Sequence, residues 1–352
     1  MSPSQSSSFG GAPITITGAN LTGATSVTVG GVAATSVVVV WSQSVTAVTP
    51  AGTVGAKSVE VTTPSGTASA ADAFTYVVPT DGYTVIEQNV NAAVVTDVTL
   101  RNAIIASGLP WRVRDNGTNI EMLLVPAGTF RMGCSASTSS DCNSDENPTH
   151  QVTLTQAFYI GRYEVTQAQW TAKMGNNPSY FVPANGYSSD TTRPVEQVSW
   201  NMIASTGGFM SVTGFRLPTE AEWEYAYRAG TTTAFHSYAA QPTGFNDDTL
   251  LGNIAWYSSN SGNQTHAVGG KLANALGLHD MSGNVYEWCQ DWNQLYPYGS
   301  VTNPTGPSTG SYRMLRGGYS SYVSNNCRSS YRSIYTPATV VSSVGFRVAR
   351  NP

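Results

Sequence analysis

The chain has 352 residues, of which 40% are hydrophobic and 11% charged, with 17 Lys plus Arg against 21 Asp plus Glu. This length and apolar content allow two domains with cores of their own, whereas the low, slightly acidic charge excludes a basic surface for nucleic acid. No apolar run approaches the roughly 20 residues of a membrane-spanning helix. We therefore expect a folded protein with neither a nucleic-acid partner nor membrane insertion.

The first eleven residues, MSPSQSSSFGG, lack the basic and apolar regions of a secretory signal peptide. Either a signal has been removed or the protein reaches the outside by another route, as a virion component would.

Residues 1–78 are rich in Thr, Val, Ala and Gly. The stretches ITIT, SVTV and SVEVTT alternate apolar and polar residues and are separated by glycine-containing turns, which predicts short strands of a small β-sandwich. The series ITITGANLTGATSVTVGGVAAT, VTAVTPAG, VEVTTPSGTAS and FTYV resembles the immunoglobulin-like IPT/TIG family. The resemblance implies a spacer or docking unit, through which the chain could form oligomers.

Residues 79–116 form a predicted connector. It contains one helix, capped by Asp97 or Thr99 and ending near Ala106, before Gly108 and Pro110. In residues 117–352 aromatic, charged and loop-forming residues are mixed. Two clear helices are predicted there, at 166–174 and at 219–228, the second with a Thr cap followed three residues later by Glu. Few helices among short strands indicate an α+β domain.

The four cysteines are few for this length. Cys134 and Cys142 bracket a Ser-rich loop, and Cys289 and Cys327 lie in segments expected to share a subdomain. An even number in a low-charge chain fits an oxidising exterior, so we predict two disulfides, Cys134–Cys142 and Cys289–Cys327, with free buried thiols as the alternative. A zinc site is disfavoured because there is no CxxC pair and the four histidines are scattered.

A series of motifs marks the second domain. They are EMLLVPAGTF with RMG, HQVTL, YEVT, PVEQVSW, FRLPTEAEWEY, NALGLHDMSGNVYEW, and the closing RGG and GFRVA. Together they resemble the formylglycine-generating enzyme/sulfatase-modifying superfamily over residues 120–350. The resemblance implies a C-type lectin-like fold.

The enzyme's chemistry is not expected to accompany that fold. The family's oxidation needs a pair of metal-binding cysteines after the RGG motif, but residues 319–326 contain none, and Cys327 aligns with the structural cysteine beyond the pair. Ser and Tyr cannot supply the soft thiolates that copper requires, and no HxxxH-type iron site is present. We therefore predict a protein that is not an enzyme and has no catalytic cofactor, with a formylglycine-generating-type oxidase as the alternative.

The resemblance extends to the variable proteins of diversity-generating retroelements, whose C-type lectin-like domains display diversified residues near the chain end. Mutagenesis of the adenines of AAY codons cannot yield Lys, Glu, Gln, Met or Trp, and residues 319–343 contain none of these. They hold eight Ser, four Tyr and three Val, a composition typical of antibody binding loops. The predicted contact residues of this variable region are Tyr319, Ser320, Ser321, Tyr322, Val323, Tyr331, Ser333, Ile334, Tyr335, Thr339, Val340, Val341 and Ser342.

A structural calcium site is also implied by the resemblance, at Asp280, Gly283, Val285 and Glu287, since hard oxygen ligands suit calcium. The alternative of equal weight is that Glu287 pairs with an arginine such as Arg316 or Arg347.

The sequence thus predicts a display protein that binds a cell-surface protein or glycan. It would act outside the cell, on a phage tail or a bacterial surface. A static lectin-like module without a variable ligand surface is the remaining alternative.

Overall fold

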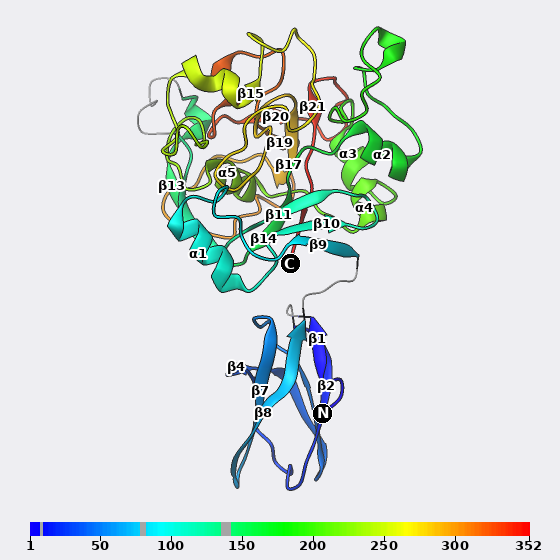
Figure 1. Cartoon of the computed structure of the whole chain (residues 1–352), viewed down its shortest axis with the longest axis vertical. Helices are drawn as coiled ribbons and strands as arrows, with labels where there is room; N and C mark the ends of the chain where they lie inside the picture. Colours follow the sequence, from blue (N-terminus) through cyan, green and yellow to red (C-terminus); the bar gives the residue numbers. More distant parts are fainter. Residues whose placement is uncertain (8–9, 78–81, 135–141) are drawn as a thin grey trace. The chain divides into compact units, whose positions relative to one another are not determined.

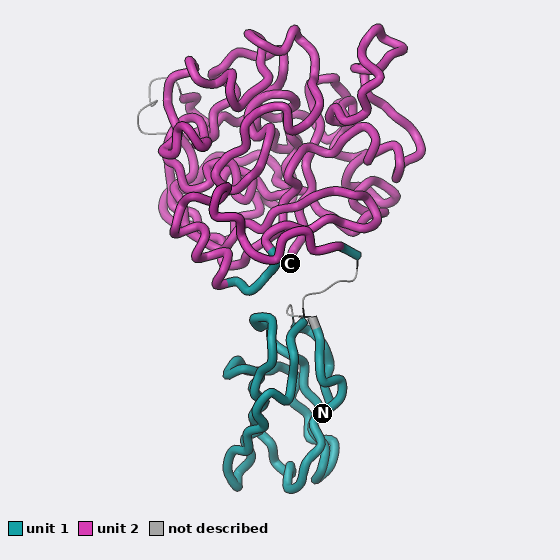
Figure 2. The backbone as a smooth tube through the Cα atoms, in the orientation of Figure 1, with its two compact units in different colours: residues 1–83, 107–110, 352 teal, residues 84–106, 111–351 magenta. Residues whose placement is uncertain are grey.

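The computed structural model describes residues 1–7, 10–77, 82–134 and 142–352. The chain divides into two compact units, one of residues 1–83 with 107–110 and 352, the other of residues 84–106 with 111–351 (Figure 2). Within the described ranges, no helix combines the length and the apolar character needed to cross a membrane.

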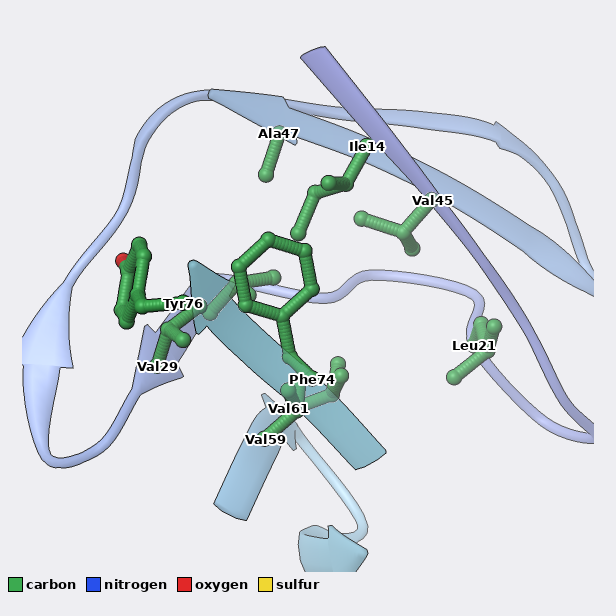
Figure 3. Close-up of a cluster of buried hydrophobic side chains, with 10 residues drawn as sticks. Ile14, Leu21, Val29, Val45, Ala47, Val59, Val61, Phe74 and Tyr76 are labelled. Carbon is green, nitrogen blue, oxygen red and sulfur yellow. The ribbon is translucent and has the colours of Figure 1, made fainter. Parts of the chain in front are cut away.

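The first unit is a sandwich of two sheets (Figure 1). The alternating residues found in the sequence place every second side chain between the sheets, where Ile14, Val29, Val45 and Phe74 pack together (Figure 3). This confirms the predicted β-sandwich. One sheet has the order β1 (Gln5–Ser7), β8 (Gly66–Val77), β7 (Gly55–Thr63), β3 (Ser26–Val29), β4 (Val32–Ala33), and the other β2 (Pro13–Thr17), β6 (Ser44–Val48), β5 (Thr35–Trp41).

The second unit contains several small sheets. A five-stranded sheet has the order β22 (Ala349–Arg350), β14 (Phe158–Gly161), β11 (Glu121–Val125), β10 (Arg112–Asp115), β9 (Tyr83–Glu87). A four-stranded sheet has the order β20 (Ser333–Tyr335), β19 (Arg313–Arg316), β17 (Tyr286–Trp292), β21 (Val344–Gly345). The remaining strands pair as β12 (Gly128–Met132), β13 (His150–Leu154), β18 (Val301–Thr302) and as β15 (Ala255–Trp256), β16 (Ser282–Gly283).

Short helices accompany these sheets. Asp97, Thr166 and Thr219 each accept a backbone N–H at a helix start, and Thr219 forms the predicted capping box with Glu222. Among the described residues the α-helices are α1 (Val98–Ser107), α2 (Gln167–Met174), α3 (Trp200–Ala204), α4 (Phe209–Thr213) and α5 (Glu220–Arg228), and the 3-10 helices are Ser144–Glu146, Pro183–Asn185, Asp248–Asn253 and Ser324–Cys327.

The region expected to be a connector is largely structured. Residues 84–106 belong to the second unit, and β9 and β10 form one side of its five-stranded sheet. Sequence reasoning found α1 but missed both strands.

The two ends of the predicted variable region adjoin the same strand of the four-stranded sheet, and β20, within the region, pairs with the other side of β19. In β17, Glu287 lies opposite Arg316 of β19 on one side and opposite Gly345 of β21 on the other. Both ends of the region are therefore held by the same residue of a central strand.

Candidate ligand-binding surface

Buried arginines fix the two ends of the region 319–343. Arg316 is fully buried and bonds Glu220 at 3.1 Å and Glu224 at 2.5 Å. Arg347, also fully buried, makes two hydrogen bonds of 2.6 Å to Glu287. Guanidinium and carboxylate groups match in such paired contacts, and each compensates the desolvation of the other. The flanks of the region are thus held by charge pairs that no surface side chain contributes to.

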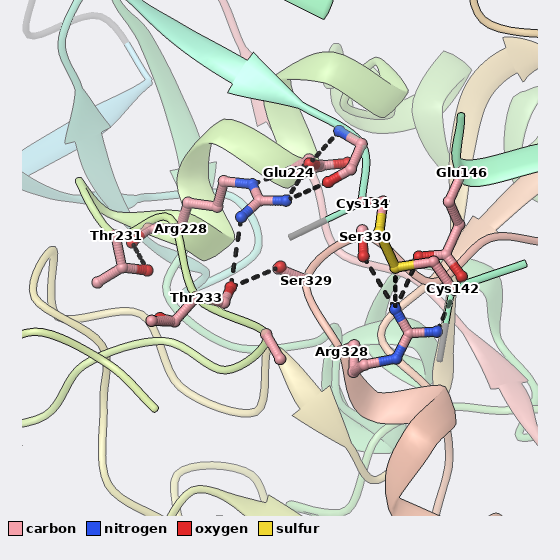
Figure 4. Close-up of polar contacts among 12 residues, drawn as sticks. Cys134, Cys142, Glu146, Glu224, Arg228, Thr231, Thr233, Arg328, Ser329 and Ser330 are labelled. Atoms are coloured by element: carbon pink, nitrogen blue, oxygen red, sulfur yellow. Dashed lines mark hydrogen bonds and ion pairs between the residues drawn. A yellow bond between two sulfur atoms is a disulfide. The ribbon is translucent and has the colours of Figure 1, made fainter. Parts of the chain in front are cut away.

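Two more arginines turn inward from within the region itself. Arg328 bonds both oxygens of Glu146 at 2.7 and 2.8 Å (Figure 4). Arg332 bonds both oxygens of Glu220 at 2.7 and 2.9 Å. These are the only charged residues between 319 and 343, and both are buried.

The ion pairs set the protonation of their carboxylates. Burial alone would raise the pKa of Glu146, but Arg328 holds it below the usual value. Burial opposes ionisation of Glu220 in the same way, and Arg332 and Arg316 outweigh it and lower its pKa. Both carboxylates are therefore charged at neutral pH.

Helix α5 supplies two of these acidic partners because of its spacing. Glu220 and Glu224 are four residues apart and lie on one helix face, where both pair with Arg316 at one end of the region. Glu224 also pairs with Arg228 one turn on, whose guanidinium donates to the Gly133 carbonyl (Figure 4). Glu222, on another face, pairs with Arg216.

The serines between the two inward arginines are buried as well. Ser329 donates its N–H to Ala234 and its hydroxyl to Thr233, and Ser330 contacts the Arg328 guanidinium (Figure 4). Residues 326–330 and 332 form a buried inner part of the region, which we call the anchor residues.

Tyrosines and valines form the outer part. The rings of Tyr319 and Tyr322 stack with centroids 5.0 Å apart, and both lie over Tyr286, which is buried in β17. Tyr322 is 36% exposed, Val323 57% and Val340 50%. The result is an uncharged aromatic surface above a rigid base.

Twelve of the thirteen predicted contact residues are at least partly exposed. The prediction of Ser320 as a contact residue is wrong, because Ser320 is 2% exposed and its backbone is hydrogen-bonded to Asn284 and Ser261. The others keep part of their surface in solvent, and we call these twelve the display residues: Tyr319, Ser321, Tyr322, Val323, Tyr331, Ser333, Ile334, Tyr335, Thr339, Val340, Val341 and Ser342. Whether they contact a ligand remains a prediction.

Sequence reasoning missed the residues beneath the display residues. Tyr286 supports the tyrosine pair, and backbone N–H groups of Gln197 and Asn201 donate to the carbonyls of Val341 and Pro337. The aromatic residue of the YEW motif is visible in the sequence, but nothing in the motif indicates a partner more than thirty residues away.

The two cysteine pairs have different outcomes. Cys134 and Cys142 form the predicted disulfide. The predicted Cys289–Cys327 bond is wrong, since both are free and buried. Cys327 packs in an apolar cluster with Phe235, whereas Cys289 lies in β17 among charged groups that include Asp291. The two thiols occupy separate parts of the core.

Groups of the predicted calcium site take part in other contacts, and calcium binding itself remains a prediction. Both oxygens of Glu287 are bonded to Arg347, and one also accepts from the Trp223 indole at 2.6 Å. The Val285 N–H donates to Glu164, and one Asp280 oxygen accepts the Gly269 N–H. In the described part of the chain, no three His, Cys, Asp or Glu residues gather as a metal site. Glu287 therefore pairs with an arginine, Arg347, which was the alternative interpretation of this residue.

Comparison with known proteins agrees with the architecture. The model of the IPT/TIG domain matches residues 1–76, and that of the sulfatase-modifying factor enzyme 1-like domain matches residues 108–352. Chaperone protein LppX of Paenibacillus barcinonensis is 31% identical over 281 residues, covering 66% of this chain and 89% of that protein. The formylglycine-generating enzyme of Thermomonospora curvata is 28% identical, covering 66% of this chain and 93% of the enzyme.

A solved structure is also similar. Treponema denticola variable protein 1 is 34% identical and superposes with a TM-score of 0.56, covering 66% of this chain and 95% of that one. The second unit has the predicted C-type lectin-like α+β fold, and the first the predicted immunoglobulin-like fold. The chain therefore belongs to the sulfatase-modifying factor enzyme 1-like family, with an IPT/TIG domain preceding the family domain.

Proposed function

We propose that the chain is a non-catalytic binding protein whose display residues are diversified by a retroelement. The observation that carries the proposal is that residues 319–343 contain both buried anchor residues and partly exposed display residues. A binding surface can change its side chains only if they do not hold the backbone, and here buried ion pairs hold it. Similarity to a Treponema denticola variable protein supports the same function.

The chemistry of the surface suits recognition of a macromolecule. Tyrosine offers a large amphipathic contact area at low entropic cost, and serine adapts its hydrogen bonds. Because both arginines of the region are buried in ion pairs, the surface carries no charge of its own. We infer that the ligand is a protein or neutral glycan exposed on a cell surface, bound outside the cell by a phage or bacterial display protein.

The enzyme alternative rests on relatives that are formylglycine-generating enzymes. Thiolate chemistry is poorly supported by this chain's free cysteines, because burial raises the pKa of Cys327 to about 12 and that of Cys289 well above its usual value. A neutral buried thiol is a weak nucleophile and metal ligand. We expect neither copper binding nor oxidation of a cysteine-containing sulfatase peptide.

A pair of libraries tests the proposal without knowledge of the natural ligand. In the first, the display residues are randomised with NNY codons, and the proteins are displayed on phage and selected on immobilised lysozyme. We expect a large folded fraction, measured by protease resistance, and lysozyme binders. The matched library randomises the anchor residues, and we expect it to lose protease resistance. Equal loss of folding in the two libraries would contradict the proposal, as would a folded first library that yields no binders.

A further inference from the structure

The first unit has an edge strand whose outer side is unoccupied. In the three-stranded sheet β2, β6, β5, strand β5 lies at the edge, and no other strand of the described residues pairs with its outer side. Val37 and Val39 point towards the sandwich core, whereas Val38 and Val40 are 55% and 58% exposed, and Trp41 is 61% exposed. An exposed apolar edge strand offers both unpaired backbone groups and side chains to a second strand.

The charged residues that often protect such an edge are absent from this sheet. Proteins commonly place Lys, Glu or Pro along an edge strand, since a charge there opposes pairing with another chain. The first charged residue of the sequence is Lys57, so β2, β5 and β6 carry no charge at all. The charges of the sandwich, Lys57, Glu60 and Asp72, lie on β7 and β8 of the other sheet.

We propose that β5 pairs antiparallel with β5 of a second copy of this chain, forming a continuous six-stranded sheet. We choose a second copy of the chain as the partner because of the composition of β5. When two identical strands pair, like residues come together, and this is favourable only where they are uncharged and apolar. A twofold axis at Val39 places Val38 opposite Val40 of the partner subunit, and valine pairs across strands stabilise a sheet. This association does not depend on the proposed ligand.

The extent of the pairing is limited by the backbone. The register of β5 against β6 shifts between Thr35 and Val38 and again between Val39 and Trp41, and Ser36 has a positive φ of 52°. Such bulges bend a strand and end regular pairing. The interface is therefore short, and we expect weak, reversible association. Two coupled display domains would raise the avidity for a repetitive cell surface.

Sedimentation velocity of the full chain over a concentration series tests the proposal. We expect the intact protein to form a reversible dimer at ~100 µM, and the variant with Val38→Lys and Val40→Lys to reduce association at least ~10-fold with an unchanged melting temperature. The matched control is Val32→Lys, an exposed valine on β4 at the edge of the other sheet, which should leave the dimer intact. A monomeric intact protein would overturn the proposal, as would dissociation by the control alone.

Opposite charges distinguish self-pairing from binding of some other strand. A second variant carries Val38→Glu and Val40→Glu. Each charged variant alone should be monomeric, but in an equimolar mixture each lysine lies opposite a glutamate of the partner subunit, and native mass spectrometry should detect the mixed dimer. If the intact protein dimerises and the mixture does not, the β5–β5 register is wrong and the proposal fails.

Discussion

The anchor residues and the display residues occupy the same stretch of chain but have opposite environments. Arg328 and Arg332 are buried against Glu146 and Glu220, while Tyr322 and Val323 project into solvent a few residues away. Antibody loops, by contrast, are positioned by a framework outside the loops themselves. Here part of the framework lies inside the loop, so stability and display can be assigned to different residues of one segment.

The largest expected effect is at an anchor arginine. Arg328→Ala leaves Glu146 buried without its charge partner, and we expect a loss of about 3–5 kcal/mol in the free energy of unfolding, measured by urea denaturation. Arg114→Ala removes a pair in which the arginine side chain is 43% exposed and should cost less than ~1 kcal/mol. Equal losses of stability in the two variants would contradict the distinction between anchor and surface charges. Replacing Arg328 with Met and Glu146 with Leu together should recover much of the stability.

The free energy of unfolding should decrease in acid because of a buried histidine. His236 is fully buried next to Phe235 of the cluster that holds Cys327, and burial lowers its pKa to about 4. Below pH ~6.5 the unfolded chain binds a proton that the folded chain excludes, so this histidine removes about 3 kcal/mol of stability as the pH falls from about 6.5 to 4. His236→Gln should therefore show a flatter decline over that range.

Other buried groups act in the opposite direction. Burial raises the pKa of Asp291 to about 8, so its contribution to stability is lost as the pH rises from its unfolded value towards 8. The prediction for His236 is accordingly the difference between the two proteins in melting temperature at matched pH. Parallel pH profiles would show that His236 is not a neutral buried group.

The disulfide should have a smaller effect. Replacing Cys134 and Cys142 with Ser removes a crosslink between residues eight positions apart, and we expect it to lower the free energy of unfolding by ~2 kcal/mol. Reductant should lower the melting temperature of the intact protein but not of this variant. Alkylation of the denatured, unreduced protein followed by peptide mass mapping should label Cys289 and Cys327 alone. If Cys289 and Cys327 were not labelled, they would be disulfide-bonded, contrary to the structure.

The smallest effects are expected at the display residues. Val323→Ala and Val340→Ala, made singly, should each change the free energy of unfolding by less than ~0.5 kcal/mol, because at least half of the surface of each residue is exposed. Differential scanning calorimetry of the two variants provides the measurement. A loss above ~2 kcal/mol at either of them would assign that residue to the anchor group.

Local patterns in the sequence predicted much of this architecture. Period-two alternation located the strands of the sandwich, and the caps Thr166 and Thr219 located α2 and α5, because both signals are set by neighbouring residues. The division of the second unit into sheets was not predictable in this way, since β10 and β11 depend on pairings outside their own residues.

Partners distant in sequence were the main source of error. Arg328 and Glu146 are separated by 182 residues, and no local signal relates them. The Cys289–Cys327 prediction failed for the same reason, because a shared subdomain does not bring two thiols into bonding distance. Ser320 was misplaced because its neighbours Tyr319 and Ser321 are partly exposed, and composition does not distinguish one serine from the next.

Glu287 lies opposite both Arg316 and Gly345, which fixes the span of the intervening chain at two strand spacings, ~10 Å, whatever its residues. The fold therefore constrains where this excursion begins and ends more strictly than its length. Doubling a flexible loop adds only about 0.6 kcal/mol of closure entropy. Extra residues inserted between Pro337 and Val340, beyond the last buried arginine, would enlarge the surface without disturbing the sheet, so the scaffold can vary in loop length as well as in side chain.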